Sequence, residues 1–138
     1  MSRLLSLSLF CLTLATVACK KDSTPPEPAL EGRWTYTDQT DTWYSSTGSR
    51  LSQGVYKNRR GYVVYTNASF QVFDIDDQPF APPTAIKRDG SKIILVDRNK
   101  VYGTITELTD HKLKILEEEP TSTKANGDYQ KSEVTYSR

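Results

Sequence analysis

Three aspartates give this sequence one carboxylate cluster with the spacing of a metal site. Asp74, Asp76 and Asp77 stand within four residues of one another, and carboxylate oxygens are ligands that Ca²⁺ prefers. The calcium-binding EF-hand loop, however, needs glycine at its sixth position and glutamate at its twelfth. Pro79 and Ala85 occupy those positions here. The pattern leaves a looser calcium site open but favours a solvated loop, and we assign no metal ligand.

Nucleophilic catalysis has few candidate residues in this chain. His111 is the single histidine, and its place beside Thr109-Asp110 makes it a turn residue. The two cysteines, Cys11 and Cys19, both belong to the N-terminal stretch. Metal sites built from several histidines or thiolates, and Cys–His catalysis, are therefore excluded. A Ser-His-Asp triad would depend on His111, without any nucleophile-elbow sequence around a serine.

Acid–base catalysis is also not indicated. Glu117, Glu118 and Glu119 are adjacent at the end of an expected strand. Neighbouring side chains of a strand point to opposite faces, so these carboxylates read as a solubilising edge and not as a catalytic pair. The sequence contains no Gly-rich phosphate loop. We expect no catalytic residue and no cofactor.

Charge argues against a nucleic-acid partner. Of the 18 basic residues, removing Arg3 of the leader leaves 17, against 17 acidic residues that all follow Cys19. A balanced chain has no broad attraction for a polyanion. Lys57, Arg59 and Arg60 form a local basic patch that fits a solvated loop or an edge strand.

Short runs separated by turn residues predict an all-β domain in the second half of the chain. Asp89-Gly90 is a strong two-residue hairpin signal. Leu113 and Ile115 alternate with lysines, and Val134 and Tyr136 alternate with polar residues, so these four should face the core. The expected strands are Thr84–Arg88, Ser91–Asp97, Lys100–Leu108, His111–Glu119 and Tyr129–Ser137.

The first half is less regular. A first strand over Arg33–Thr37 should turn Trp34 inward, and Gly61–Thr66 should pair with Ser69–Ile75. We expect residues 38–54, rich in Ser, Thr, Gly and Asp, to be a mobile stretch around a weak strand. Prolines exclude a central strand from Gln78 to Thr84. Together the elements predict a small up-and-down antiparallel β-barrel or meander of about eight strands.

The N-terminus has the three zones of a secretory signal. Arg3 supplies the positive charge, and Leu4–Val17 is an uncharged run of about 14 residues, shorter than the roughly 20 that a permanent membrane helix needs. Thr16-Val17-Ala18-Cys19 resembles the lipobox of bacterial lipoproteins. The resemblance implies cleavage after Ala18 and attachment of diacylglycerol, with acyl chains such as palmitate, to Cys19.

Three segments follow from this assignment. Residues 1–18 are the signal peptide, residues 19–29 the lipidated N-terminus with a flexible Pro-rich tether, and residues 30–138 the β domain. More than one acyl chain gives stable anchoring. We therefore expect a membrane contact through the lipid on Cys19, most readily at the outer membrane. The sequence does not assign the periplasmic face or the cell surface.

A family resemblance begins at Leu30-Glu31-Gly32-Arg33-Trp34. A Pro-rich tether, a Gly-x-Trp first strand and a meander of hairpins together resemble the lipocalin-like lipoproteins of Gram-negative bacteria. The resemblance implies that Trp34 closes the barrel floor, that Gly32 allows close backbone approach, and that Arg138 packs over Trp34.

The sequence leaves more than one function open. The leading expectation is a non-catalytic envelope domain that binds a small apolar ligand inside the barrel or at its mouth. Aromatic residues expected in loops could supply the contacts: Trp43, Tyr44, Tyr56, Tyr62 and Tyr65. The alternative is a protein-interaction, inhibitor or accessory module of the envelope with a solid barrel. An enzyme ranks third.

Overall fold

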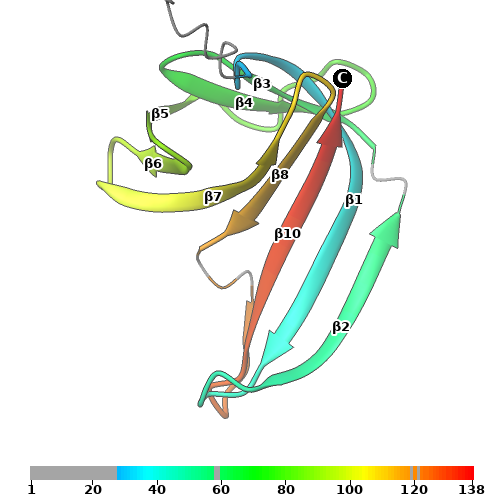
Figure 1. Cartoon of the computed structure of the whole chain (residues 1–138), viewed down its shortest axis with the longest axis vertical. Coiled ribbons are helices and arrows are strands. Elements are labelled where there is room, and N and C mark those ends of the chain that lie inside the picture. Colours follow the sequence, from blue (N-terminus) through cyan, green and yellow to red (C-terminus); the bar gives the residue numbers. More distant parts are fainter. Residues whose placement is uncertain (1–27, 58–59, 119, 121) are drawn as a thin grey trace, which may run out of the picture.

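The computed structural model describes residues 28–57, 60–118, 120 and 122–138 as ten β-strands without a helix (Figure 1). The predicted signal peptide, Cys19 and the tether up to residue 27 lie outside the described residues, as do Arg59 and Glu119. The strands are β1 Gly32–Tyr44, β2 Arg50–Lys57, β3 Tyr62–Tyr65, β4 Ser69–Phe73, β5 Thr84–Asp89, β6 Lys92–Leu95, β7 Lys100–Leu108, β8 Lys112–Glu117, β9 Ser122–Thr123 and β10 Tyr129–Ser137.

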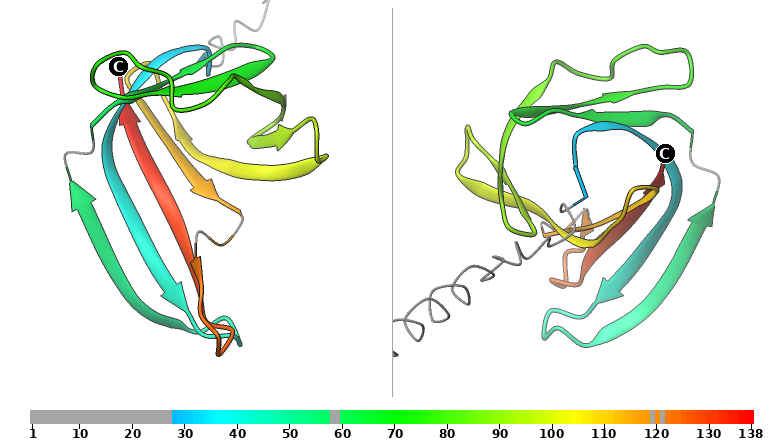
Figure 2. Two further views of the ribbon diagram at one scale, coloured as in Figure 1. Left: turned by 180° about the vertical axis from the view of Figure 1, so that it is seen from behind. Right: turned by 45° about the horizontal axis from the view of Figure 1, so that its top comes forward.

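Eight of the strands close into an antiparallel barrel. The order runs β1-β3-β4-β5-β6-β7-β8-β10, and pairing of β1 with β10 joins the two ends. The right-hand view of Figure 2 looks toward this ring, with the first described residues crossing it. The predicted fold class, an all-β up-and-down barrel of eight strands, is confirmed. β2 and β9 are additional strands outside the ring.

The hairpins expected in the second half are confirmed. Asp89-Gly90 lies at the β5–β6 turn, where Gly90 takes a positive φ of 57°. Asn99 takes a φ of 48° in the turn before β7, a conformation that asparagine tolerates better than most residues. β7 and β10 have the predicted bounds. Local turn chemistry was therefore sufficient to predict these hairpins, although β6 and β8 are shorter than expected and β9 was not predicted.

The prediction for residues 38–54 is wrong. β1 continues through this segment to Tyr44, a short turn over residues 45–49 reverses the chain, and β2 pairs with β1 from Asp38 to Tyr44. The same half of β1 pairs on its other side with the first half of β10. These strand halves extend beyond the barrel as a ribbon of β2, β1 and β10 (Figure 1).

A polar network holds the ribbon together where it leaves the barrel. The hydroxyl of Ser132, 1% exposed, donates to Oδ1 of Asp41 at 2.7 Å. The side-chain amide of Gln39 donates to the same oxygen at 2.6 Å. Because Ser132 lies on β10 and Asp41 on β1, this network joins the two long strands across their shared face. Polar residues such as Gln39 and Asp41, whose composition suggested a mobile stretch, therefore hold paired strands together.

The barrel core comes from alternate residues of its wall. Leu113 and Ile115 of β8 are 0% and 1% exposed, and Val134 and Tyr136 of β10 are also buried, as the alternation predicted. Gly103 of β7 lies beside β8 where no side chain would fit, because an added Cβ would stand 2.6 Å from Ile115 Cγ2. Close approach of β7 and β8 thus depends on glycine at this position.

Candidate functional site

Trp34 of β1 is a buried tryptophan that contacts both ends of the described chain. Trp34 is 0% exposed, and its indole Nε1 donates to the carbonyl of Leu30 at 2.7 Å. The guanidinium of Arg138 lies 4.1 Å from the centroid of the Trp34 ring, a cation–π distance. The segment before β1 and the last residue of the chain therefore meet at Trp34.

Arg138 also fastens three backbone segments. Its guanidinium donates to the carbonyls of Asp110 at 2.8 Å, Glu31 at 2.9 Å and Ala29 at 3.0 Å. Gly32 has a φ of +123°, and a Cβ there would stand 3.1 Å from Arg138 Nη1. The structure thus brings together the three residues that the resemblance assigned to the barrel floor: Gly32, Trp34 and Arg138.

Aromatic side chains meet across the barrel interior. The ring of Phe70 on β4 stacks on that of Tyr102 on β7, with centroids 5.2 Å apart. In the ring of strands β5 and β6 separate β4 from β7, so this contact spans the interior and not neighbouring strands. Tyr65 and Phe70, with ring centroids 5.7 Å apart, and Tyr36 and Tyr136, 4.8 Å apart, are pairs between neighbouring strands. The contact of Phe70 with Tyr102 therefore joins two non-adjacent strands of the barrel through its interior.

The interior hydroxyls remain protonated at neutral pH. Burial raises the pKa of Tyr65, Tyr102 and Tyr136 above the ordinary tyrosine value, and the neighbouring tyrosines raise the pKa of Tyr102 and Tyr136 further. The hydroxyl of Tyr102 donates to Oε1 of Glu117 at 3.3 Å. A protonated, hydrogen-bonded phenol is a structural group and a poor nucleophile. Tyr36, Phe70 and Tyr102 are nevertheless only partly buried.

Asp74 and Asp77, two of the residues considered for metal binding, make structural hydrogen bonds. Oδ1 of Asp74 accepts hydrogen bonds from the backbone amides of Asp76 and Gln78 at 2.9 and 2.8 Å, and so closes a turn. Asp77 accepts from the hydroxyl of Tyr62. Exposed His111 lies in the β7–β8 turn. Among the described residues, no group of three His, Cys, Asp or Glu side chains could hold a metal ion.

The aromatic residues expected in loops lie in strands instead. Trp43 and Tyr44 end β1, Tyr56 lies in β2, and Tyr62 and Tyr65 belong to β3, where both are buried. The loop assignment of Trp43, Tyr44 and Tyr56 was wrong because the ribbon strands were missed, whereas Tyr62 and Tyr65 lie in the strand that the sequence analysis itself expected over Gly61–Thr66. Lys124 lies 4.4 Å from the Trp43 ring centroid, and Tyr44 stacks on Tyr129 at 5.4 Å. The aromatic residues at the ribbon tip therefore have partners within the domain.

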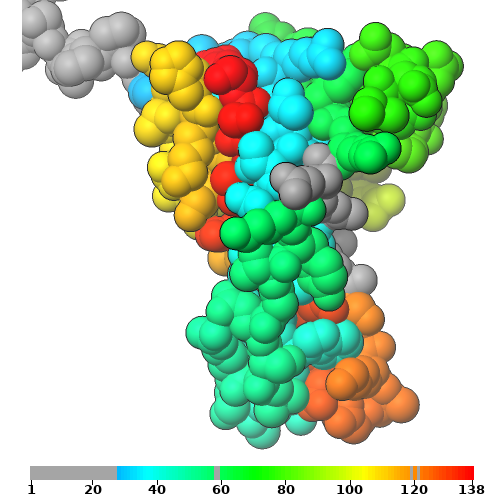
Figure 3. Space-filling model, turned by 90° about the vertical axis from the view of Figure 1, so that its right-hand side faces the viewer, coloured from blue at the N-terminus to red at the C-terminus, as the bar shows by residue number. Residues whose placement is uncertain are grey.

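β2 is an exposed strand that the sequence did not predict. It pairs with β1 on one side, and in the described chain it is the end of the sheet. Leu51, Val55 and Tyr56 are 54%, 57% and 57% exposed. Figure 3 shows β2 along the surface of the narrower lobe below the barrel. The one sequence feature that indicated this edge was the basic patch that includes Lys57, because such a patch is compatible with an edge strand.

Two hollows lie on the outer side of the strands. One, of ≈ 360 Å³, is lined by Lys92, Lys100, Val101 and Glu118 beside β6 and β7. The other, of ≈ 170 Å³, is bordered by residues of β1, β2, β8 and β10 where the ribbon meets the barrel. Glu118 lines the first hollow, and its carboxylate lies 3.5 Å from Lys131, which borders the second. The two hollows are therefore neighbours.

No family model, curated protein or solved structure matches this chain. Within the residues that the structure describes, no helix has the length and apolar character needed to cross a membrane. The functional argument therefore depends on the geometry of the barrel and ribbon and on the N-terminal sequence.

Proposed function

We propose that this chain is a lipid-anchored lipoprotein of the bacterial cell envelope whose ribbon binds an extended segment of a partner protein. The observation that carries the proposal is the exposed edge of β2, eight residues long. An edge strand presents unpaired backbone amides and carbonyls, to which another chain can add a strand. The barrel is then a rigid, non-catalytic support for that edge.

Apolar side chains would add to the backbone hydrogen bonds of such a complex. Val55 lies opposite Thr40 and Tyr56 opposite Gln39 on β1, so Val55 and Tyr56 are presented on opposite faces of the ribbon. Both are more than half exposed. An added strand could cover one on each face, because its own side chains alternate in the same way.

The charge around β2 favours an acidic partner segment. β2 itself contains no Asp or Glu and has Arg50 and Lys57 at its two ends. On its paired side Asp38 and Asp41 of β1 lie opposite Lys57 and Gly54, so the free side of β2 is the one without acidic residues of its own strand. Antiparallel pairing of two β2 strands, centred between Gln53 and Gly54, would place Arg50 opposite Lys57. Like charges opposite each other destabilise a strand pair. A second copy of the chain is therefore disfavoured, and acidic residues at those positions are favoured.

A small apolar ligand is the second candidate. The partly buried rings of Tyr36, Phe70 and Tyr102 favour it, because aromatic side chains with remaining solvent contact can stack on a ligand. The contact of Phe70 with Tyr102 across the interior weighs against a ligand held deep inside. A small barrel filled by its own side chains fits the interaction module better.

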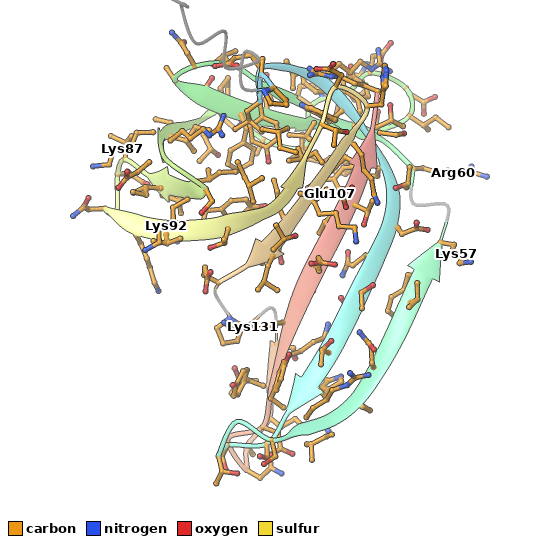
Figure 4. The ribbon with its side chains drawn as sticks, viewed as in Figure 1. Lys57, Arg60, Lys87, Lys92, Glu107 and Lys131 are labelled. Carbon is orange, nitrogen blue, oxygen red and sulfur yellow. The ribbon has the colours of Figure 1, made fainter. Side chains whose placement is uncertain are left out.

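A peptide titration followed by amide NMR tests the proposal. An eight-residue peptide with Glu at its first and last positions and Val and Thr between them should shift the amides of β2, and the same peptide with Lys at both ends should not. Arg50→Glu combined with Lys57→Glu should weaken binding at least about tenfold, or about 1.4 kcal/mol. Lys87→Glu on β5 is the matched control, because Lys87 projects from the side of the molecule opposite Lys57 (Figure 4).

Two outcomes would contradict the peptide-binding proposal. Equal binding of the acidic and basic peptides would contradict the preference for an acidic partner. Amide shifts confined to residues outside β2 would contradict binding at the β2 edge. Indole, titrated separately, tests the second candidate. Shifts at Tyr36 and Tyr102 with indole, and none at β2 with either peptide, would favour the small-ligand function.

A further inference from the structure

The smaller of the two outer hollows has the composition of a binding site. It lies on the outer face of the sheet, where strand register aligns Thr40 with Glu133 and Thr42 with Lys131 across β1 and β10. Gln53 of β2 lies opposite Thr42 on the other side. Three strands therefore direct polar side chains to one face, and Leu116 of β8 completes the border.

Several hydrogen-bonding groups at this hollow are unused by the protein. Among the described residues, the hydroxyls of Thr40 and Thr42 make no hydrogen bond, and the amide nitrogen of Gln53 has no acceptor. Arg50 donates to Oε1 of Gln53, which fixes the orientation of the amide. Two hydroxyls and one oriented amide are thus available to a ligand that both donates and accepts hydrogen bonds.

The charges at the hollow are already compensated. Lys131 Nζ lies 3.5 Å from Glu118 Oε2. Glu133 accepts from the hydroxyl of Thr106 at 3.1 Å and lies 3.9 Å from Lys114 Nζ. Because each charged side chain has an opposite or hydrogen-bonding partner within the protein, neither an anion nor a cation is selected. A neutral ligand is favoured.

An aromatic ring stands at the same hollow. Tyr44 borders it and stacks on Tyr129, with ring centroids 5.4 Å apart and planes inclined by 18°. The stack restrains the Tyr44 ring, so that less side-chain freedom is lost when a ligand packs beside it. An aromatic ring beside hydroxyl and amide groups suits a ligand that has an apolar C–H face and a polar rim.

We propose that this hollow binds one ring of a neutral saccharide. The volume of ≈ 170 Å³ corresponds to about five or six waters at roughly 30 Å³ each, which is room for a single ring. Ring hydroxyls would bond Thr40, Thr42 and Gln53, and the C–H face would lie near Tyr44. This site is separate from strand addition at β2, because it uses the face of the ribbon and not its edge.

Amide NMR titration with neutral and charged sugars tests the proposal on the folded domain. The probes are glucose, galactose, mannose and N-acetylglucosamine, each up to about 50 mM, a range that detects millimolar dissociation constants. Glucuronate and glucosamine are the charged controls. At least one neutral sugar should shift amides near Thr40, Thr42 and Lys131, and the charged controls should bind more weakly.

Variants show whether sugar binding takes place at this hollow. Thr42→Ala with Gln53→Ala should weaken sugar binding at least about tenfold, with an otherwise unchanged amide spectrum. Ser52→Ala is the matched control, because Ser52 pairs with Trp43 and so faces the other side of the ribbon. The proposal is overturned if no neutral sugar binds, if a charged control binds more tightly, or if the double variant binds as the wild type does.

Discussion

At the scale of single residues, Trp34 combines burial with a hydrogen bond and a cation–π contact. It is fully buried, its indole is hydrogen-bonded to Leu30, and Arg138 covers its ring. Trp34→Ala would remove all three interactions and leave a cavity. We expect the free energy of unfolding to fall by about 3–5 kcal/mol, a large part of the stability of a small domain.

Urea denaturation of Trp34→Ala beside His111→Ala measures this contrast. The exposed turn residue His111 should change the unfolding free energy by less than about 0.5 kcal/mol when its side chain is removed. A Trp34→Ala protein as stable as the wild type would contradict the assigned role of Trp34 in closing the barrel.

Glu118 gives a prediction for pH dependence. The hydrogen bond from Thr104, at 2.6 Å, lowers the pKa of Glu118 below its ordinary 4.5, and nearby Lys131 lowers it further against the opposing effect of burial. A carboxyl with a depressed folded-state pKa stabilises the fold above the unfolded-state pKa, and loses this contribution as pH falls through the folded-state pKa. The contribution of Glu118 is therefore present at neutral pH and decreases below about pH 4.5.

Thr104→Val isolates that effect. Without the donor hydroxyl, the midpoint of the Glu118 carboxyl titration, followed by NMR, should move up toward 4.5. Thr106→Val is the control, because the Thr106 hydroxyl bonds Glu133 and not Glu118. An unchanged Glu118 midpoint in Thr104→Val would exclude the hydrogen bond as the main cause.

At the scale of strands, two strand glycines should respond differently to an added methyl group. A Cβ at Gly103 would stand 2.6 Å from Ile115 Cγ2 and 3.0 Å from the carbonyl oxygen of Leu116. Gly103→Ala should therefore push β7 from β8 and cost about 1–3 kcal/mol.

Gly54→Ala in β2 is the matched comparison. The nearest atom to its added Cβ would belong to the Tyr56 ring at 3.7 Å, an ordinary contact. The change should alter the unfolding free energy by less than about 1 kcal/mol, or increase it, because alanine has less conformational freedom in the unfolded chain. Thermal unfolding of both variants would contradict this account of strand packing if Gly103→Ala were the milder change.

The strands also show where sequence patterns are informative. β7, β8 and β10 have one face in the core and one in water, so Leu113 and Ile115 alternate with lysines and the pattern predicts their orientation. The ribbon half of β1 has no comparable apolar face: on the side that faces Ser132 it carries Gln39, which donates to the Ser132 hydroxyl, and Asp41, which accepts from it. Without apolar alternation, a strand of Ser, Thr and Asp cannot be told from a loop by sequence.

At the scale of the whole molecule, the same limit applies to the candidate sites. Arg138 and Trp34 are in contact although they stand near opposite ends of the domain's sequence, and only the family resemblance suggested this contact. The β2 edge and the hollow beside Thr42 follow from how the ribbon leaves the barrel, which no local pattern encodes. Predicting them requires the pairing of β1 with both β2 and β10.

The proposed membrane anchor at Cys19 can be tested on the whole molecule. The lipobox at Cys19 predicts that lipid is the attachment, and the polar tether predicts that the barrel folds without it. Cys19→Ser should therefore move the protein from the washed membrane fraction to the soluble periplasmic fraction. Its amide spectrum should remain that of the folded barrel, since the contacts of Trp34 with Leu30 and Arg138 do not involve Cys19.

Two measurements keep this outcome unambiguous. Mass spectrometry of the variant must show removal of residues 1–18, because an uncleaved leader would itself hold the chain in the membrane. Protease treatment of intact cells expressing the wild type then distinguishes the cell surface from the periplasmic face. A processed Cys19→Ser protein that stays in washed membranes would contradict the lipid anchor, and would point instead to the barrel or its ribbon as a second membrane contact.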